Sequence, residues 1–397
     1  MVQKLEACRL CGGEVKEVLN LGNMAFTGIF PKPGESVPHG RLALALCKGE
    51  CGLVQLADRF DLNLLYGPNY GYRSGLNAAM VGHLTTVAGN LAKLTNLEAG
   101  DVCIDIGSSD GTLLGALPTD AVRIGVDPSA GKFLGFYPEG VVSIPEFFPN
   151  ARLDTLLGER KAKLVTSIAM FYDLEDPLAF AAKVKDLLAP DGVWYLEQSY
   201  LPAMIAQNAY DTICHEHIEY YSIRQMAYIA KKAGLKIVHL GFTETNGGSF
   251  EVAFTLPEST YPEARNLASG LLNEVEFNLD DEATYVAFKA SIEHTKDTLL
   301  TLLSRLPNKP WGFGASTKGN VLLQYCGIGP TALEGIYDIN PDKEGCMTPG
   351  TNIPITATPP KDATYLVLPW HFRDNILDRH PDTTFIFPLP YVKVDRG

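Results

Sequence analysis

From Asp101 onward, short apolar runs alternate with stretches of helical periodicity, and this rhythm constrains the fold more than any other feature. The runs VCIDIG (102–107), RIGVD (123–127) and VWYLEQS (193–199) have the length of buried strands and end in turn residues. The helical stretch DPLAFAAKVKDLLAPDG (176–192) precedes the last of them. Strands that alternate with helices predict a parallel, doubly wound sheet. We therefore expect an α/β fold with a Rossmann-like core.

Flanking patterns place further elements around this core. Apolar residues at helical spacing predict a helix over 77–97 and amphipathic helices over about 258–306. The runs LKIVHLGFTE (235–244) and GSFEVAFTL (248–256) predict an antiparallel pair that closes the sheet. After Pro310 a second α/β rhythm begins, which indicates a further α/β unit.

The first sixty residues are rich in Gly, Pro and Cys and predict a small module of loops and strands. Their cysteines form two short-spaced pairs, Cys8 with Cys11 and Cys47 with Cys51. Such pairs suit a tetrahedral zinc ion, because each turn can present two thiolates to one metal. Four protein ligands leave no open position, so we expect a structural zinc. Four unrelated buried cysteines are the alternative.

At 397 residues the chain is too long for one typical core, so two or three domains are expected. We place a zinc-binding domain at 1–65 and a central α/β domain, entered by a helical linker, at 66–260. A helical connector and a C-terminal α/β domain occupy 261–397. A monomer or a weak homo-oligomer is expected of such a chain.

Charge and hydropathy exclude several partners. The net charge of −13 argues against nucleic acid, whose phosphates would be repelled. No run of eighteen apolar residues appears, and the N-terminus MVQKLEACRL lacks the apolar segment of a signal peptide. We therefore expect a cytoplasmic protein without a membrane partner, whose eight cysteines are reduced.

The turn after the first predicted strand, in VCIDIGSSDGTLLGAL, is suited to binding a cofactor. Gly107 and Gly111 allow a tight turn and the close approach of a ligand to the backbone near Ser109. Pyrophosphate-binding folds use similar turns, so the glycines alone do not identify the ligand. The acids Asp105 and Asp110 would repel a pyrophosphate but suit the aminoacyl sulfonium of S-adenosylmethionine. The spacing D-x-G-x-x-x-G also resembles motif I of the class I methyltransferases.

Two later strand ends add to this predicted cofactor site. Asp127 ends the second strand, where an acid can accept hydrogen bonds from both ribose hydroxyls. Phe147 and Phe148 follow the third strand and could flank an adenine, with plain core packing as the alternative.

The stretch CHEHIEYYS (214–222) concentrates groups that transfer protons. His215 and His217 are two residues apart, so on a helix they would diverge and could not bind one metal from one face. On a loop, His217 suits a general base, with Glu216 orienting it or holding a substrate hydroxyl. A polar helix start is the alternative. The preceding strand end supplies three candidate substrate-binding residues, Glu197, Gln198 and Tyr200, because ligands bind at the carboxyl ends of parallel strands.

Taken in order, these features resemble the nucleotide-sugar C-methyltransferases, of which the TDP-4-keto-6-deoxysugar C-3 methyltransferases are the best-known examples. The most specific match is HEHIEYYS (215–222), close to the family's E-H-x-x-Y-[YF]-S segment, and NGGSFEV (246–252) and GASTKGN (314–320) also match. The resemblance implies a zinc domain, an S-adenosylmethionine-dependent methyltransferase core of class I and a C-terminal Rossmann-like domain. It implies that His217 removes the proton next to a keto group and that Glu216 contacts the sugar.

The resemblance also carries further residues and two departures. Tyr70 and Tyr72 resemble tyrosines that close over the family's cleft. Cys214 stands where the characterised C-3 enzymes carry a tyrosine, and Asp173 stands where some carry a histidine. Since both positions touch the sugar in the family, the sugar and the methylated carbon stay open.

The chemistry requires an enolate, because carbon is a poor nucleophile until a base removes a proton beside a ketone. Hydroxyls of Tyr70, Tyr72 or Tyr221 could stabilise the developing oxyanion. The turn GFGASTKGN suits a sugar-nucleotide pyrophosphate, and it supplies the candidate phosphate-binding residues Ser316, Thr317 and Lys318. A tight structural turn is the alternative there.

Four functions therefore remain in competition at this stage. The leading prediction is S-adenosylmethionine-dependent C-methylation of a keto-deoxysugar nucleotide at C-3. An epimerase that reprotonates the same enolate is the second. An NAD-dependent sugar oxidoreductase using either glycine turn is the third, and a non-catalytic binding protein is the fourth.

Overall fold

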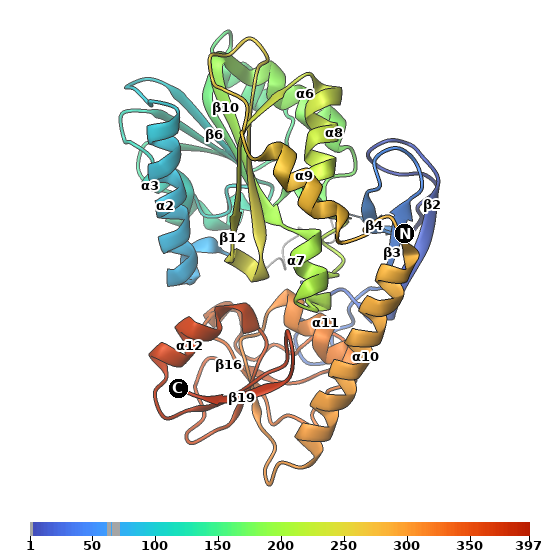
Figure 1. Cartoon of the computed structure of the whole chain (residues 1–397). Helices are drawn as coiled ribbons and strands as arrows, with labels where there is room; N and C mark the ends of the chain where they lie inside the picture. The colour runs from blue at the N-terminus through green and yellow to red at the C-terminus, as the bar shows by residue number, and fades with distance from the viewer. Residues whose placement is uncertain (1–2, 62–64, 66–71) are drawn as a thin grey trace.

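A computed structural model describes residues 3–61, 65 and 72–397 of the chain. Figure 1 shows a large central sheet between helices, a small N-terminal unit at its side and a C-terminal α/β unit below it. The long helix α10 (Glu282–Ser304) runs along the N-terminal unit and down to the C-terminal one. Within the described ranges, no helix has both the length and the apolar character needed to cross a membrane.

The central sheet has the strand order β12-β13-β10-β9-β6-β7-β8. Strands β8, β7, β6, β9 and β10 run parallel, and β13 is antiparallel to both β10 and β12. The predictions of a doubly wound parallel sheet and of a closing antiparallel pair are therefore confirmed. The strands span Val102–Ile106 (β6), Val122–Val126 (β7), Val141–Ile144 (β8), Ala162–Ile168 (β9), Leu188–Ser199 (β10), Lys236–Thr243 (β12) and Ser249–Thr255 (β13).

Helices cover both faces of this sheet (Figure 1). The helix predicted over 77–97 is α2 (Ala78–Leu94), and it begins where the Asn77 side chain accepts a hydrogen bond from the Ala79 N–H. Leucines of α2 and α3 pack on one face of the sheet, and apolar side chains of α6 and α8 pack on the other. The remaining helices of this unit are α3 (Thr112–Ala116), α4 (Ala130–Phe133), α5 (Ala151–Leu157), α6 (Pro177–Leu187), α7 (Leu201–Ala206) and α8 (Ile223–Ala233).

The N-terminal unit is built on a sheet with the order β11-β4-β3-β2. Its edge strand β11 (Glu219–Tyr220) does not come from the N-terminus but from the HEHIEYYS segment. The sequence pattern did not predict this pairing, because a two-residue strand has no periodicity of its own. The other strands here are β1 (Gln3–Lys4), β2 (Val15–Ala25), β3 (His39–Cys47), β4 (Val54–Leu56) and β5 (Asp58–Arg59).

The predicted helical region over 258–306 is two helices, α9 (Leu267–Val275) and α10. Asn278 adopts a left-handed backbone (φ 48°), and the Asp281 side chain caps a new helix start, so the first helix cannot continue. The C-terminal sheet follows with the order β16-β15-β14-β17-β18-β19. Its strands and helices are β14 (Trp311–Phe313), α11 (Thr317–Cys326), β15 (Ile336–Tyr337), β16 (Ile355–Thr356), β17 (Tyr365–Val367), α12 (Arg373–Arg379), β18 (Thr384–Phe387) and β19 (Lys393–Arg396).

Candidate active site

The four predicted metal ligands lie together in the N-terminal unit. The Sγ atoms of Cys8, Cys11, Cys47 and Cys51 all lie within 4.8 Å of one another, and none forms a disulfide. The Sγ atoms of Cys8 and Cys51 are 3.5 Å apart, and those of Cys11 and Cys47 are 3.4 Å apart. Four thiol groups around one point, with no open position, match the ligand set of a structural zinc site.

Two short turns present these thiols, and we name them the first knuckle (Cys8–Cys11) and the second knuckle (Cys47–Cys51). A Cβ at Gly49 would lie 3.2 Å from the Cys11 Sγ, so glycine lets the two knuckles approach. A hydrogen bond from Cys51 lowers the pKa of the Cys8 thiol, although burial opposes this. The direction of this shift favours the thiolate, which is the form that binds zinc.

A cavity of about 440 Å³ opens at the carboxyl ends of β6, β7, β9 and β10. Among the residues of the predicted cofactor turn, Asp105, Gly107 and Ser109 line it, and Asp127 lines it from the next strand. Gly107 has φ 82°, and a Cβ there would lie 2.7 Å from the Met170 Cγ. The remaining predicted residues in its wall are Tyr72, Phe147, Phe148, Asp173, Glu197 and Gln198.

The two acids at the strand ends differ in their surroundings. Burial raises the pKa of Asp105 to about 7, although Thr166 Oγ1 donates a hydrogen bond to it at 2.7 Å. Asp127 accepts hydrogen bonds from the backbone N–H groups of Ser109 (2.8 Å) and Ser129 (2.6 Å), and burial raises its pKa. A concave site with acids at two strand ends fits the ammonium and the ribose of S-adenosylmethionine.

Two other residues of the predicted cofactor turn lie outside this cavity. Asp110 accepts a hydrogen bond from the Gly75 N–H at 2.9 Å and lies 3.8 Å from the Arg73 guanidinium, so it ties the turn to the segment before α2. Gly111 is the N-cap of α3 with φ 77°. The structure thus assigns Asp110 and Gly111 to the local architecture of the turn rather than to the cavity wall.

The cavity also contains a pair that sequence patterns did not reveal. His83 on α2 places its Nε2 2.8 Å from Oε2 of Glu197, and both residues line the cavity. The interaction with Glu197 raises the pKa of His83. Helical periodicity predicts that His83 lies on a helix, but it does not predict which way the side chain points. Its partner is 114 residues away in the chain. No local signal could have found this pair.

His217 lies beside the cavity rather than in its wall. Its Nδ1 is 3.0 Å from the Thr212 carbonyl oxygen, and its ring packs on Tyr172 with centroids 4.2 Å apart. Because a carbonyl only accepts, Nδ1 carries the hydrogen and Nε2 keeps its lone pair. Burial, assisted by the charge of Lys318, lowers the pKa of His217 to about 3, so the ring is neutral at pH 7.

A void of about 10 Å³ adjoins His217 and is also lined by Tyr172, Ser199 and Tyr200. That is room for about one water molecule. Tyr172 and Ser199 are the chain neighbours of Asp173 and Gln198, which line the large cavity. The void beside His217 and the large cavity are thus lined by neighbouring residues of the same two segments.

Glu216 points toward the N-terminal and C-terminal units. Thr27 Oγ1 donates to its Oε2 at 3.3 Å, and burial raises its pKa. A Cβ at Gly28 would collide with Oε1 of Glu216, so a larger residue there would displace the carboxylate. Glu216 Oε1 is buried without a hydrogen-bond partner among the described residues, as is the Tyr220 hydroxyl. Buried polar groups without partners are costly, so a polar ligand at this place would stabilise them.

The other tyrosines and the cysteine of this region have separate positions. Tyr221 is 1% exposed, and its hydroxyl donates to Glu219, away from the cavity. Cys214 is fully buried, and burial raises its pKa. Tyr72 is 49% exposed at the cavity wall. Tyr70, which was predicted to close over the cleft, lies outside the described residues.

The turn before α11 approaches the same region from the C-terminal unit. The Ser316 hydroxyl accepts a hydrogen bond from the Gly319 N–H at 2.9 Å and so caps the helix. Lys318 Nζ donates to the Asn246 carbonyl oxygen at 3.2 Å, and Asn246 lines the large cavity. Burial lowers the pKa of Lys318. Of the predicted phosphate-binding residues, Lys318 is thus the one hydrogen-bonded to a residue of the cavity wall, while Thr317 lies near Gly28.

Three family models match consecutive parts of the chain. "Putative zinc binding domain" matches residues 8–66, "Methyltransferase domain" matches 82–240 and "C-methyltransferase C-terminal domain" matches 244–390. The chain is also 28% identical to the C-methyltransferase NovU of Streptomyces niveus, over 99% of this chain and 98% of that protein. The chain is thus similar, part by part and over its whole length, to C-methyltransferases. It is an S-adenosylmethionine-dependent methyltransferase with a zinc-binding domain.

Solved structures resemble about half of this methyltransferase chain. One is a chain from the complex of the Haloferax volcanii Trm112 methyltransferase activator with a methyltransferase, at a TM-score of 0.37 and 16% identity over 45% of this chain and 95% of that chain. Another is the N-methyltransferase NodS of Bradyrhizobium japonicum, at a TM-score of 0.34 and 14% identity over 46% and 99%.

Proposed function

We propose that the enzyme methylates C-3 of an NDP-4-keto-6-deoxyhexose through an enolate, with His217 as the base. The observation that carries this proposal is the tautomer of His217, whose Nδ1–H donates to the Thr212 carbonyl and leaves the Nε2 lone pair free. The relationship to a C-methyltransferase over the whole length of the chain supports carbon as the methylated atom.

In the proposed reaction, Nε2 of His217 takes the proton from the sugar carbon beside the ketone. The electron pair of the broken C–H bond moves onto the keto oxygen, and the charge on that oxygen needs a donor. When bound, S-adenosylmethionine would supply the electrophilic methyl group, and S-adenosylhomocysteine would be its leaving group. The new C–C bond uses the enolate electron pair, and the proton on His217 passes to solvent in the next opening of the site.

The low pKa of His217 has a role in this scheme. Burial and the nearby charge of Lys318 make the ring a weak base in the free enzyme. A substrate diphosphate close to Lys318 would offset that charge and raise the pKa of His217. The base would thus gain strength only when the sugar nucleotide is present.

We assign the remaining site residues by position. Asp105, Gly107, Ser109 and Asp127 would hold the cofactor with Phe147 and Phe148 at the adenine. Glu216, Gln198 and Glu197 would contact the sugar, together with Asp173 and Tyr72. The domain division at 1–65, 66–260 and 261–397 is part of the same proposal.

The test separates proton removal from methyl transfer. A panel of 4-keto-6-deoxyhexose nucleotides is first screened by mass spectrometry for a methylated product. The accepted sugar is then incubated in heavy water with S-adenosylhomocysteine, and deuterium at the carbon is followed by NMR. His217→Asn keeps a side-chain donor for the Thr212 carbonyl but has no base, so exchange should fall about 100- to 10,000-fold.

His294→Asn is the matched control, because it makes the same replacement at an exposed histidine of α10 outside the cavity wall, and it should keep the wild-type exchange rate. Equal exchange in wild type and His217→Asn would eliminate His217 as the base. Deuterium in an unmethylated product formed with S-adenosylmethionine would instead indicate an epimerase.

A further inference from the structure

We propose that the cysteine cluster positions the active site. Its two knuckles form hydrogen bonds to the two chain segments that would line this site. Arg9 and Gln225 act as the positioning residues. The inference rests on the proposed function only where it treats His217 as the base; the contacts themselves do not depend on it.

The first knuckle reaches the cofactor cavity through Arg9. The Arg9 side chain is fully buried, and its Nε donates to Oε2 of Glu175 at 3.3 Å. Its two terminal nitrogens donate to the carbonyl oxygens of Leu56 (3.0 Å) and Asp58 (3.2 Å). Glu175 lines the large cavity. Through these three hydrogen bonds, the buried guanidinium connects the first knuckle to the N-terminal sheet and to the cavity wall.

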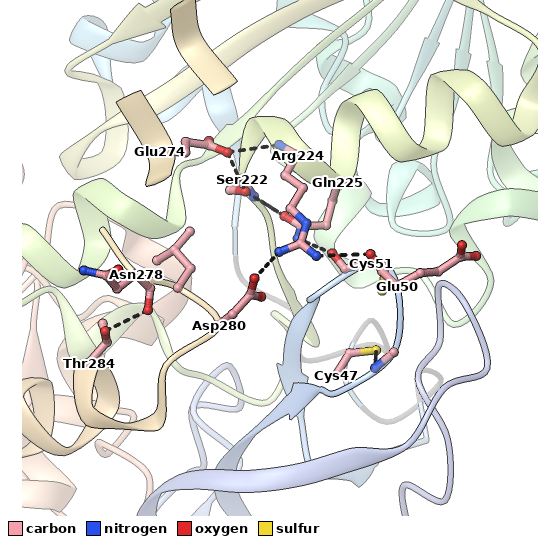
Figure 2. Close-up of polar contacts among 12 residues, drawn as sticks. Cys47, Glu50, Cys51, Ser222, Arg224, Gln225, Glu274, Asn278, Asp280 and Thr284 are labelled. Atoms are coloured by element: carbon pink, nitrogen blue, oxygen red, sulfur yellow. Dashed lines mark hydrogen bonds and ion pairs between the residues drawn. The ribbon is translucent and has the colours of Figure 1, made fainter. Parts of the chain in front are cut away.

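The second knuckle reaches the base-carrying segment through Gln225, as Figure 2 shows. Gln225 Nε2 donates to the Cys51 carbonyl oxygen at 2.7 Å, while its Oε1 accepts from the Ser222 N–H at 2.8 Å. Arg224 adds a hydrogen bond to the Glu50 carbonyl oxygen at 3.1 Å. Ser222 is the N-cap of α8 and the last residue of HEHIEYYS. The helix start that ends this segment is thus anchored on the knuckle.

Strand pairing makes a second connection to the same segment. In β11, Glu219 pairs with Gln55 and Tyr220 with Val54 of β4, which begins three residues after Cys51. The Leu56 N–H donates to the Ile218 carbonyl at 2.8 Å, and the Ile218 N–H donates to the Tyr172 carbonyl at 3.0 Å. Tyr172 is the ring on which His217 packs.

Apolar packing joins the same parts. Cys8, Cys47 and Cys51 belong to one buried cluster with Phe171 and Tyr221, which flank the catalytic region. Dense cores transmit displacement, so a loosened knuckle would shift the segments packed on it. A shift of about 1 Å at a catalytic group is enough to reduce turnover about 100-fold.

The alternative is that zinc stabilises only the N-terminal unit. Hydrogen exchange on the intact wild-type protein distinguishes the two. After a chelator removes the metal, amides at 215–225 should exchange about tenfold faster, while those of β14, β17 and β18 keep their rates. Faster exchange confined to residues 3–61, with 215–225 at the metal-bound rate, would overturn the proposal.

Gln225→Met tests the second knuckle without touching a cysteine. We expect one zinc per chain by elemental analysis and an unchanged affinity for S-adenosylhomocysteine, with faster amide exchange at 215–222. Deuterium incorporation into the sugar should fall about tenfold or more. Asp281→Ala removes the cap of α10 beside the same unit and serves as the control for general loss of a helix cap. Wild-type exchange at 215–222 in Gln225→Met would contradict the role of Gln225.

Arg9 is tested by a double-mutant cycle with Glu175, read by calorimetry of S-adenosylhomocysteine binding. Arg9→Lys and Glu175→Gln should each weaken binding about fivefold, and the double variant should be no weaker than either single variant. Arg59→Lys is the control, since Arg59 also meets Glu175, at 3.4 Å, from outside the knuckle. Additive losses, or no loss in Arg9→Lys, would overturn the link.

These readouts separate the two proposals. Amide exchange, zinc content and cofactor affinity do not involve the sugar. If His217→Asn retains substrate exchange while Gln225→Met loosens 215–222, the base assignment fails and the positioning role stands.

Discussion

Two strand–turn–helix units of this enzyme share the same local construction. In the central sheet, Gly107 (φ 82°) follows the last residue of β6, and in the C-terminal sheet, Gly314 (φ 79°) follows the last residue of β14. In each case an aspartate after the next strand accepts a hydrogen bond from the turn backbone. Asp127 accepts from the Ser109 N–H at 2.8 Å, and Asp338 accepts from the Ala315 N–H at 2.6 Å.

The two turns differ in what lies against them. The first turn faces the large cavity, with Asp105 two residues before its glycine. The second turn has Gly312 at the corresponding place, and its surface is occupied by protein. Lys343 Nζ donates to the Ala315 carbonyl at 2.6 Å and lies 3.5 Å from Asp338. The same local construction thus lines a cavity in one sheet and packs against Lys343 in the other.

The variant with the largest expected effect distinguishes the functions of the two turns directly. Asp127→Ala should weaken S-adenosylhomocysteine binding about 100-fold, because it removes the ribose acceptor and opens the turn. Asp338→Ala should leave that affinity within about twofold but lower the free energy of unfolding by about 1–3 kcal/mol, because the Ala315 N–H loses its partner. Calorimetry and chemical denaturation give the two values. Equal losses of affinity would mean that the second turn also binds the cofactor.

Lys318 tests whether the second turn serves the sugar nucleotide. Lys318→Met should raise the KM for the sugar nucleotide about tenfold or more and leave S-adenosylhomocysteine affinity unchanged. Because the charge of Lys318 disfavours the imidazolium, its removal should also raise the pKa of His217 from about 3, which NMR titration can follow. An unchanged KM would remove Lys318 from substrate binding.

The acid in the first turn predicts a pH dependence. Asp105 has a pKa of about 7, so below that pH it is increasingly protonated and loses its attraction for an ammonium group. Affinity for S-adenosylhomocysteine should therefore fall as pH drops from 7 to 6, by up to about tenfold per unit, and level off above pH 8. Asp105→Asn should bind more weakly at pH 8 and show a flat profile. A sloping profile in the variant would assign the titration to another group.

The smallest expected effect is on cofactor affinity, from the aromatic ring that we propose to lie beside the adenine. Phe147 is 43% exposed at the cavity, so Phe147→Ala should reduce cofactor affinity only about two- to threefold, without a change in Tm. Phe136→Ala is the control, since Phe136 is 57% exposed under the Arg73 guanidinium and is not part of the cavity wall. A loss above about tenfold would show that the ring is a main cofactor contact.

Much of the architecture followed from patterns that neighbouring residues impose. Alternating apolar runs predicted the central sheet, and the spacing of Cys8, Cys11, Cys47 and Cys51 predicted a four-thiol cluster. The positions of Asp105, Asp127 and Glu197 near the carboxyl ends of β6, β7 and β10 were likewise predicted, because parallel strands bring these ends to one edge. Such features depend on backbone periodicity, which is local.

Other features depended on contacts between residues far apart in the chain. The pairing of β11 with β4, the His83–Glu197 pair and the Arg9–Glu175 ion pair each join separate segments. The orientation of Tyr221 toward Glu219, and of Asp110 toward Gly75, followed from the same packing. Composition and spacing therefore determined which chemical groups this enzyme has and at which strand ends they stand. Only the tertiary structure decided which of them meet, because side-chain direction and burial are set by elements that pack together from distant parts of the chain.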